Sequence, residues 1–255
     1  MREAAALGRP IPAGLQVRAS GADAARAYRH ACDLAEAGAE ALLSFGLAGG
    51  LHPALGPGSV VVANQVLEVG AAMLAPEPAG SFRERLQSMF APFARVFAQP
   101  PEALPPPTAD AAYETDGGLT KRLVELSGGR VALGPVAGVE RIVGTREGKV
   151  ALFAKTRALA VDMESQGVAR AATERGLPFG VLRVVLDPSN RELPSVLARA
   201  VRPDGSTTLR PILCGLLLNP FELGGLLSVG IDSAAGLRAL RRVGGRLGPA
   251  LLGGL

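Results

Sequence analysis

The chain has 255 residues, of which 48% are hydrophobic and 4% aromatic, and its formal net charge is +4. The length suits one large α/β domain or a domain with an appended piece, and the composition excludes disorder of the whole chain. No basic run alternates with aromatic residues, so we expect no nucleic-acid partner. Cys32 and Cys214 lack metal-ligand spacing, so we expect two reduced thiols in a cytoplasmic protein without a metal or cofactor.

Helix and strand patterns alternate along most of the chain. Asp23 predicts the N-cap of a helix that runs to about Ala37, and a short buried strand, 41–45, leads into a glycine turn, 46–50. A valine-rich strand follows from Val60. Further helices are predicted over 119–126, over 145–156 with basic residues on its polar side, and over 165–175. The alternation predicts an α/β fold with a central mixed sheet flanked by helices.

Two segments differ in composition from this pattern. Residues 76–118 are proline-rich around one amphipathic stretch, so we interpret them as an insertion or lid outside the sheet, within a domain over 1–197. Residues 198–255 carry seven arginines, three acidic residues and no lysine, and 211–231 is strongly apolar. We expect an apolar helical C-terminal extension, which either covers the sheet or meets lipid or a very apolar ligand.

Acidic residues follow two apolar strands, at Asp162 and Glu164 and again at Asp187. Ligands of open α/β sheets bind outside the carboxyl ends of the strands. Each acid alone fits a helix cap or a turn, and at 162–164 one carboxylate can cap the helix while the other faces a cleft. Together they predict a pocket that binds a polyol and protonates a base. We expect Glu164 and Asp187 to converge on one nucleoside-sized hollow floored by residues 46–50.

Two stretches, "FGLAGGL…GPGSVVVA" and "AVDMES…A…GLPFGVLRVVLD", resemble the purine nucleoside phosphorylase and methylthioadenosine/S-adenosylhomocysteine nucleosidase superfamily. Within it, the block "GPVAGVERIVGTREGKVALFAKTRALAVDMES" and the later "RPDGS" are most similar to the hopanoid-associated phosphorylases. The resemblance implies the phosphorylase/hydrolase-like three-layer fold and a homo-oligomer.

The resemblance also assigns roles to individual residues. It implies that Glu164 accepts hydrogen bonds from ribose hydroxyls, that Met163 packs against the sugar, and that Asp187 is the general acid toward purine N7. A partly buried aspartate resists ionisation and so can hold the proton that it donates. Substrate contacts are further expected from Val139 and from the glycine segment, whose members are Gly46, Leu47, Ala48 and Gly49.

The implied reaction is cleavage of a purine N-glycosidic bond by a pentosyltransferase that uses inorganic phosphate as co-substrate. The narrower match implies release of adenine from adenosylhopane, a nucleoside with a large apolar substituent, by a cytoplasmic protein that can dock at the inner membrane face. Two alternatives remain at this point. One is a methylthioadenosine-type nucleoside hydrolase, and the other is an inactive nucleoside- or lipid-binding protein of the same fold.

The sequence departs from the family pattern in two places. Leu47 stands where the superfamily often has a serine or threonine that holds phosphate or water, and Arg2 or Arg141 would have to hold the phosphate. Glu3 is the expected counterpart of the acid that activates water in the nucleosidases. The apolar strand that precedes this acid in the family is missing, so we expect the true start to lie upstream.

Overall fold

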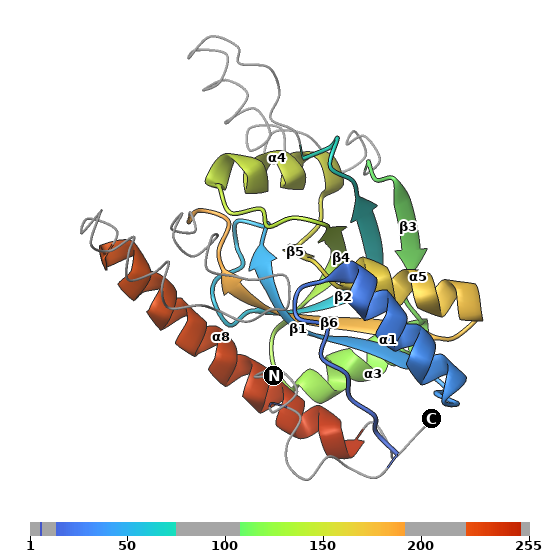
Figure 1. Ribbon diagram of the computed structural model, residues 1–255. Coiled ribbons are helices and arrows are strands. Elements are labelled where there is room, and N and C mark those ends of the chain that lie inside the picture. Colours follow the sequence, from blue (N-terminus) through green and yellow to red (C-terminus); the bar gives the residue numbers. More distant parts are fainter. Residues whose placement is uncertain (1–5, 7–13, 75–107, 192–222, 251–255) are drawn as a thin grey trace, which may run out of the picture.

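The computed structural model describes residues 6, 14–74, 108–191 and 223–250. The described strands are β1 (Leu42–Gly50), β2 (Val60–Val69), β3 (Ala111–Glu114), β4 (Val131–Val139), β5 (Ala160–Asp162) and β6 (Phe179–Asp187). The described helices are α1 (Ala24–Glu36), α3 (Gly117–Ser127), α4 (Arg146–Thr156), α5 (Ser165–Arg175) and α8 (Leu223–Ala250). Figure 1 shows the helices arranged around the sheet.

The six strands form one mixed sheet in the order β3-β2-β4-β5-β1-β6. β1 is parallel to β6, and β4 is parallel to both β2 and β5. The β1–β5 and β2–β3 pairs are antiparallel. β2 also pairs antiparallel with β6, so the sheet curls until its last strand returns to its second. The predicted α/β fold with a mixed sheet is thus confirmed.

Helices cover the sheet on both faces. α1 and α5 contribute their small buried residues to a core cluster with β1, β2, β4 and β6; these residues are Ala31, Cys32, Ala169, Ala171 and Ala172. α3 and α8 build a second cluster with β2 and β6, and its members include Leu123, Leu182, Leu240 and Leu247. Burial of a leucine side chain stabilises the fold by about 1.5–3 kcal/mol, so these contacts hold the layers together. α4 covers a third cluster with Leu152 and Phe153.

Local signals place several helix ends where the sequence predicts them. The side chain of Asp23 accepts a hydrogen bond from the backbone N–H of Arg26 at 2.8 Å, and α1 begins at the next residue. Gly128 and Gly176 adopt left-handed conformations at the ends of α3 and α5. Glycine lacks the Cβ that disfavours this conformation in other residues, so it ends helices at low cost.

Residues 46–50 form a strand, and the prediction of a glycine turn there is wrong. β1 continues through Gly50 because its backbone pairs with β6 as far as Gly49 and then with β5 at Gly49 and Gly50. The pairing of β1 with β6 is irregular at one point, where its register shifts between Ala48 and Gly49. The glycines permit close packing at this point, since a Cβ on Gly50 would lie 3.0 Å from a Val185 methyl group.

Residues 111–114 also belong to the sheet, although the sequence places them in the insertion. They form β3 because their backbone pairs with β2 from Gln65 to Glu68. The preceding stretch, 75–107, lies outside the described residues. The prediction for 145–156 is correct as a helix, but one of its basic residues, Lys149, is completely buried rather than on the polar side.

The long helix α8 packs along the sheet face that α3 also covers. Leu240, Val243 and Leu247 are buried, whereas the side chains of Arg241 and Arg242 are exposed, as expected for a helix that covers a sheet. Much of the apolar 211–231 stretch lies outside the described residues. Within the described part of the chain, no helix is long and apolar enough to cross a bilayer.

Candidate functional site

One acid ends β5 and a second follows it, and the structure gives them different partners. Asp162 is buried and accepts hydrogen bonds from the backbone N–H and the hydroxyl of Ser165, so it caps the start of α5. It also forms a buried ion pair with Arg183 of β6. The guanidinium of Arg183 further donates to the hydroxyls of Ser44 and Ser165. Asp162 therefore stabilises the fold, and the carboxylate of Glu164 has other hydrogen-bond partners.

Glu164 lies at the junction of β5 and α5 and faces the segment that precedes α1. Its Oε1 accepts a hydrogen bond from the hydroxyl of Ser20 at 2.9 Å and another from the backbone N–H of Ala22 at 2.8 Å. Its Oε2 lies 3.9 Å from a guanidinium nitrogen of Arg183. One carboxylate oxygen is thus anchored by the protein, while the other keeps capacity to accept hydrogen bonds from a ligand.

Asp187 ends β6 and is almost fully buried. Its Oδ2 contacts the ammonium group of Lys149, which comes from the first turns of α4 and has no exposed side-chain surface. Its Oδ1 lies over β1, where a Cβ on Gly49 would be 3.3 Å away. A cation in contact with a carboxylate favours its ionised form, which opposes the expected effect of burial alone.

The β1 strand connects these two acids. Gly46 is the register partner of Arg183, which lies beside Glu164, and Gly49 is the register partner of Asp187. Three residues along a strand span about 10 Å. The backbone of β1 therefore advances by that length between the register partners of Arg183 and Asp187.

Apolar side chains gather near the same ends of the strands. Met163 packs against the cluster that contains Leu51, Val139 and Phe153. The imidazole of His52 stacks edge-to-face on the Phe153 ring with a centroid distance of 5.4 Å. Burial lowers the pKa of His52 from its usual 6.5, so the ring favours its neutral form. The two predicted substrate contacts, Met163 and Val139, thus share one apolar environment.

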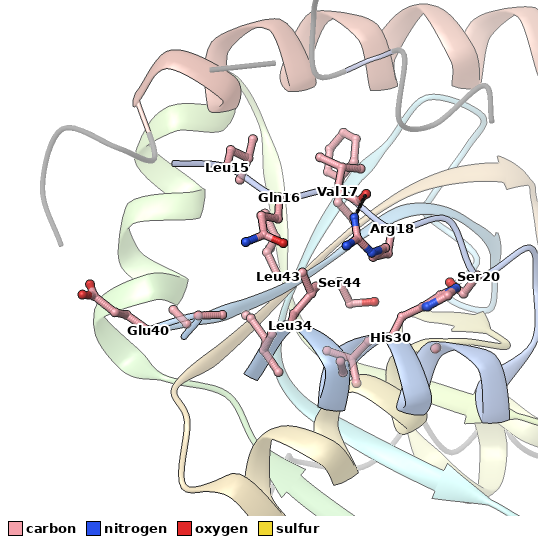
Figure 2. Close-up of a pocket in the computed structure, with 18 of the residues that line it drawn as sticks. Leu15, Gln16, Val17, Arg18, Ser20, His30, Leu34, Glu40, Leu43 and Ser44 are labelled. Atoms are coloured by element: carbon pink, nitrogen blue, oxygen red, sulfur yellow. Dashed lines mark hydrogen bonds between the residues drawn. The ribbon is translucent and has the colours of Figure 1, made fainter. Parts of the chain in front are cut away.

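A cavity of about 580 Å³ lies between α1, α3 and the segment before α1 (Figure 2). Gln16 and Arg18 come from that segment, and Leu34 from α1. Leu43 and Ser44 of β1 also line it, together with Glu164. The cavity runs beside the first half of β1. In the described part of the chain, that half of β1 pairs with β6 on one edge, and β5 joins only at Gly49.

This cavity differs from the expected one. Glu164 lines it, but Asp187 does not, and Phe45 is the last β1 residue on its wall. The prediction of one hollow floored by 46–50 and shared by both acids is therefore not met by this cavity. The two acids have separate partners: Asp187 contacts Lys149, whereas Glu164 accepts hydrogen bonds from Ser20 and Ala22.

The remaining predicted residues occupy several environments. The side chain of Leu47 packs against the cluster beneath α3 and α8, so it has a structural role in the core. Gly46 and Ala48 are paired strand residues. Arg141 is exposed in the segment after β4. Glu3 and Arg2 lie outside the described residues.

Sequence reasoning misses three partners of the predicted acids. Lys149 and Arg183 are cations that the fold buries completely, and Ser20 lies before α1, 144 residues away from the Glu164 that it contacts. A signal for Arg183 exists in the sequence, because a charged residue inside the apolar strand "VLRVVL" needs a buried partner. Lys149 gives no such signal, since lysine on a short amphipathic helix is usually exposed.

Comparisons with known proteins agree with this architecture. The sequence profile of the Phosphorylase superfamily matches residues 19–217. The fold is similar to Helicobacter pylori 5′-methylthioadenosine/S-adenosylhomocysteine nucleosidase, with a TM-score of 0.55 and 18% identity over 92% of this chain and 78% of that one. Helicobacter pylori futalosine hydrolase is similar with a TM-score of 0.55 and 19% identity, again over 92% of this chain and 78% of that one. A putative methylthioadenosine nucleosidase of Weissella paramesenteroides is similar with a TM-score of 0.54 and 17% identity, over 96% of this chain and 94% of that one. No curated protein matches this chain.

Proposed function

Because the chain belongs to the phosphorylase superfamily, we propose that it cleaves the N-glycosidic bond of an adenosyl compound. The observation that carries this proposal is the placement of two carboxylates beside β1: Glu164 lines a cavity together with Ser44, and Asp187 lies at Gly49. The proteins of similar fold include nucleosidases and a futalosine hydrolase, which supports the same class of reaction.

In the proposed mechanism, the ribose hydroxyls donate hydrogen bonds to Oε2 of Glu164. Ser20 and Ala22 hold the other oxygen of this carboxylate, so the acceptor is already oriented. As the C–N bond breaks, the sugar develops positive charge, and the carboxylate stabilises it. Asp187 delivers a proton to N7, so that the purine leaves as a neutral base. Met163 and Val139 supply the apolar wall.

We further propose that the adenosyl compound carries a large apolar 5′-substituent and that adenosylhopane is its substrate. The apolar composition of 211–231 and the exposed arginines of α8, Arg238, Arg241 and Arg242, support a protein that works at the inner membrane face. In this proposal, inorganic phosphate attacks the sugar, and the protein acts as a homo-oligomer.

Hydrolysis of the same N-glycosidic bond is the second candidate reaction, and the environment of Leu47 favours it. The side chain at this position packs into the core, so no hydroxyl from it is offered to phosphate. Arg141 is exposed, which also leaves phosphate without an evident buried guanidinium from this position. Water needs fewer ligands than a phosphate dianion.

Mass spectrometry of the products distinguishes the candidates. Adenosylhopane and methylthioadenosine are each incubated with the protein, with and without phosphate. A sugar phosphate together with adenine supports phosphorolysis, and a free sugar in the absence of phosphate supports hydrolysis. Asp187→Asn should reduce turnover far more than nucleoside affinity, because the amide has no proton to deliver to N7. Adenine release from neither substrate, despite measurable nucleoside binding, would instead identify a binding protein.

A further inference from the structure

The outer face of α8 carries an arginine stripe, which consists of Arg238, Arg241, Arg242 and Arg246. Neighbours in this set are separated by one, three or four residues, so their side chains lie on one side of the helix, and all four residues are exposed. The sequence contains no acidic residue between positions 233 and 255. The second half of α8 therefore presents concentrated positive charge.

The first three arginines of the stripe form no ion pair or hydrogen bond with the described residues. Two exposed arginines of α5, by contrast, pair with glutamates. The fourth member, Arg246, donates from Nη1 to the carbonyl oxygens of Ser127 at 3.2 Å and Gly128 at 3.0 Å. This contact ties α8 to the end of α3 and leaves the other three guanidinium groups open to a partner.

The opposite face of the same helical turns is buried. Leu240, Val243 and Leu247 pack into the cluster that α8 shares with α3 and the sheet. Figure 1 shows α8 along one side of the molecule, so the stripe faces away from the sheet. A helix that is held by its apolar face and exposes only positive charge suits an anionic surface.

We propose that the arginine stripe docks the protein on an anionic membrane surface, where its guanidinium groups bind lipid phosphates. This inference rests on the proposed function, which places the protein at the inner membrane face, and it names the surface and the chemical group that hold it there. Four or more basic residues on an amphipathic helix are typical of binding to anionic lipids, and each favours the bound state roughly fivefold.

Two features of α8 favour lipid over nucleic acid as the anionic partner. The sequence from 223 to 255 contains no aromatic residue, so it offers bases no ring on which to stack. Residues 223–231 of the same helix contain no charged residue. An apolar stretch followed by a basic one suits the boundary between acyl chains and headgroups.

The stripe begins close to the strand end that carries Asp187. A Cβ on Gly236 would lie 3.1 Å from a methyl group of Leu186 and 3.3 Å from the carbonyl oxygen of Val185. Gly236 stands two residues before Arg238, and Leu186 directly precedes Asp187. Docking through the stripe would therefore hold this end of β6 about one helix diameter, ~10 Å, from the headgroups. A nucleoside with an apolar substituent is held in that lipid.

The test is sedimentation of the full chain with sucrose-loaded lipid vesicles. The wild type should bind vesicles that contain phosphatidylglycerol, but not vesicles of pure phosphatidylcholine, and about 1 M salt should release it because the screening length falls to about 3 Å. The combined variant Arg238→Gln, Arg241→Gln and Arg242→Gln should bind roughly 100-fold more weakly. Lysine at the same three positions keeps the charge and should retain most of the binding.

The matched control removes the same number of charges from other elements. It replaces one exposed arginine each of α1, α4 and α5 by glutamine, namely Arg29, Arg146 and Arg175. This control should bind vesicles like the wild type, and circular dichroism checks that both variants are folded. Should the combined stripe variant fail to fold, its three single variants replace it, each with an expected loss of roughly fivefold.

The outcomes separate the docking surface from the proposed function. Equal losses in the stripe variant and the control, or vesicle binding that survives without the stripe, contradict the inference. Binding to a DNA duplex but not to phosphatidylglycerol would assign the stripe to nucleic acid and overturn it. Adenine release from methylthioadenosine is measured without vesicles. Release without vesicle binding refutes only the docking surface, and vesicle binding without release from any nucleoside refutes only the proposed reaction.

Discussion

Gly49 lies directly against the carboxylate of Asp187: a Cβ at this position would be 3.3 Å from Oδ1 and 3.7 Å from Oδ2. The same Cβ would lie 3.2 Å from a methyl group of Val161. β1 therefore needs a residue without a side chain where it passes the acid. This contact explains why a glycine stands near the end of β1, where the sequence alone suggested a turn.

Gly49→Ala should reduce turnover of the nucleoside by about tenfold or more, because the added methyl group would displace the Asp187 carboxylate that it crowds. A loss of about 1.4 kcal/mol of transition-state stabilisation corresponds to a tenfold slower reaction. Steady-state kinetics measure the effect. Gly56→Ala is the matched control, since a Cβ there meets nothing within 4 Å. Equal activity of the two variants would show that turnover does not depend on the position of the Asp187 carboxylate.

Glu164→Gln should lower kcat/KM for a ribonucleoside by roughly 10- to 100-fold, the range for a lost hydrogen bond to a charged group at about 1.5–3 kcal/mol. The loss should be smaller for the 2′-deoxy nucleoside, which already lacks one of the hydroxyls. Measuring kcat/KM for both nucleosides with the wild type and with Glu164→Gln gives the coupling between Glu164 and the 2′-hydroxyl. A loss of the same size for the two nucleosides would mean that Glu164 acts on the protein rather than on the sugar.

Arg183→Met should destabilise the fold by about 3–5 kcal/mol, because it leaves the buried carboxylate of Asp162 without its cation. Urea unfolding followed by circular dichroism gives the free energy. Arg175→Ala breaks the exposed pair with Glu36, which is 2.9 Å long. That control should cost less than about 1 kcal/mol. If the two variants lose similar stability, the network around Arg183 is not holding the strands together.

The sequence predicts the elements whose signals are local. The Asp23 cap and the valine run from Val60 each act within a few residues, so they could be recognised from the sequence without knowledge of the fold. Glycine at 46–50 was misread as a turn, because glycine is common in turns while its use here is to let β1 pass close to Asp187 and Val185. Only the neighbouring strands reveal that requirement.

The site shows the same division. The positions of Glu164 and Asp187 at strand ends follow from the alternation of apolar runs and acids. The partner of Asp187 does not, because Lys149 is 38 residues away and lies on a helix whose polar residues were expected at the surface. Burial of a lysine depends on where α4 packs, which is a tertiary property. The ion pair of Asp187 therefore could not be predicted from its own strand.

The chain has two tyrosines, Tyr28 and Tyr113, and both should titrate at unusually high pH. Burial, together with a hydrogen bond to Glu68, raises the pKa of Tyr113 to about 12. A hydrogen bond to Glu174 is the main cause that raises the pKa of Tyr28 to about 12. Ultraviolet absorbance of phenolate should therefore rise near pH 12 in the folded protein and near pH 10 in denaturant, the ordinary value for tyrosine.

The same shifts predict that stability falls at alkaline pH. Between about pH 10 and 12 the unfolded chain releases its phenolic protons while the folded protein retains them, so their contribution to stability is complete below pH 10 and is lost as pH rises through this window. Unfolding free energies measured across the window test the sign. Tyr113→Phe should make the fall shallower, because its phenol no longer releases a proton on unfolding. An unchanged slope in this variant would show that Tyr113 titrates alike in both states.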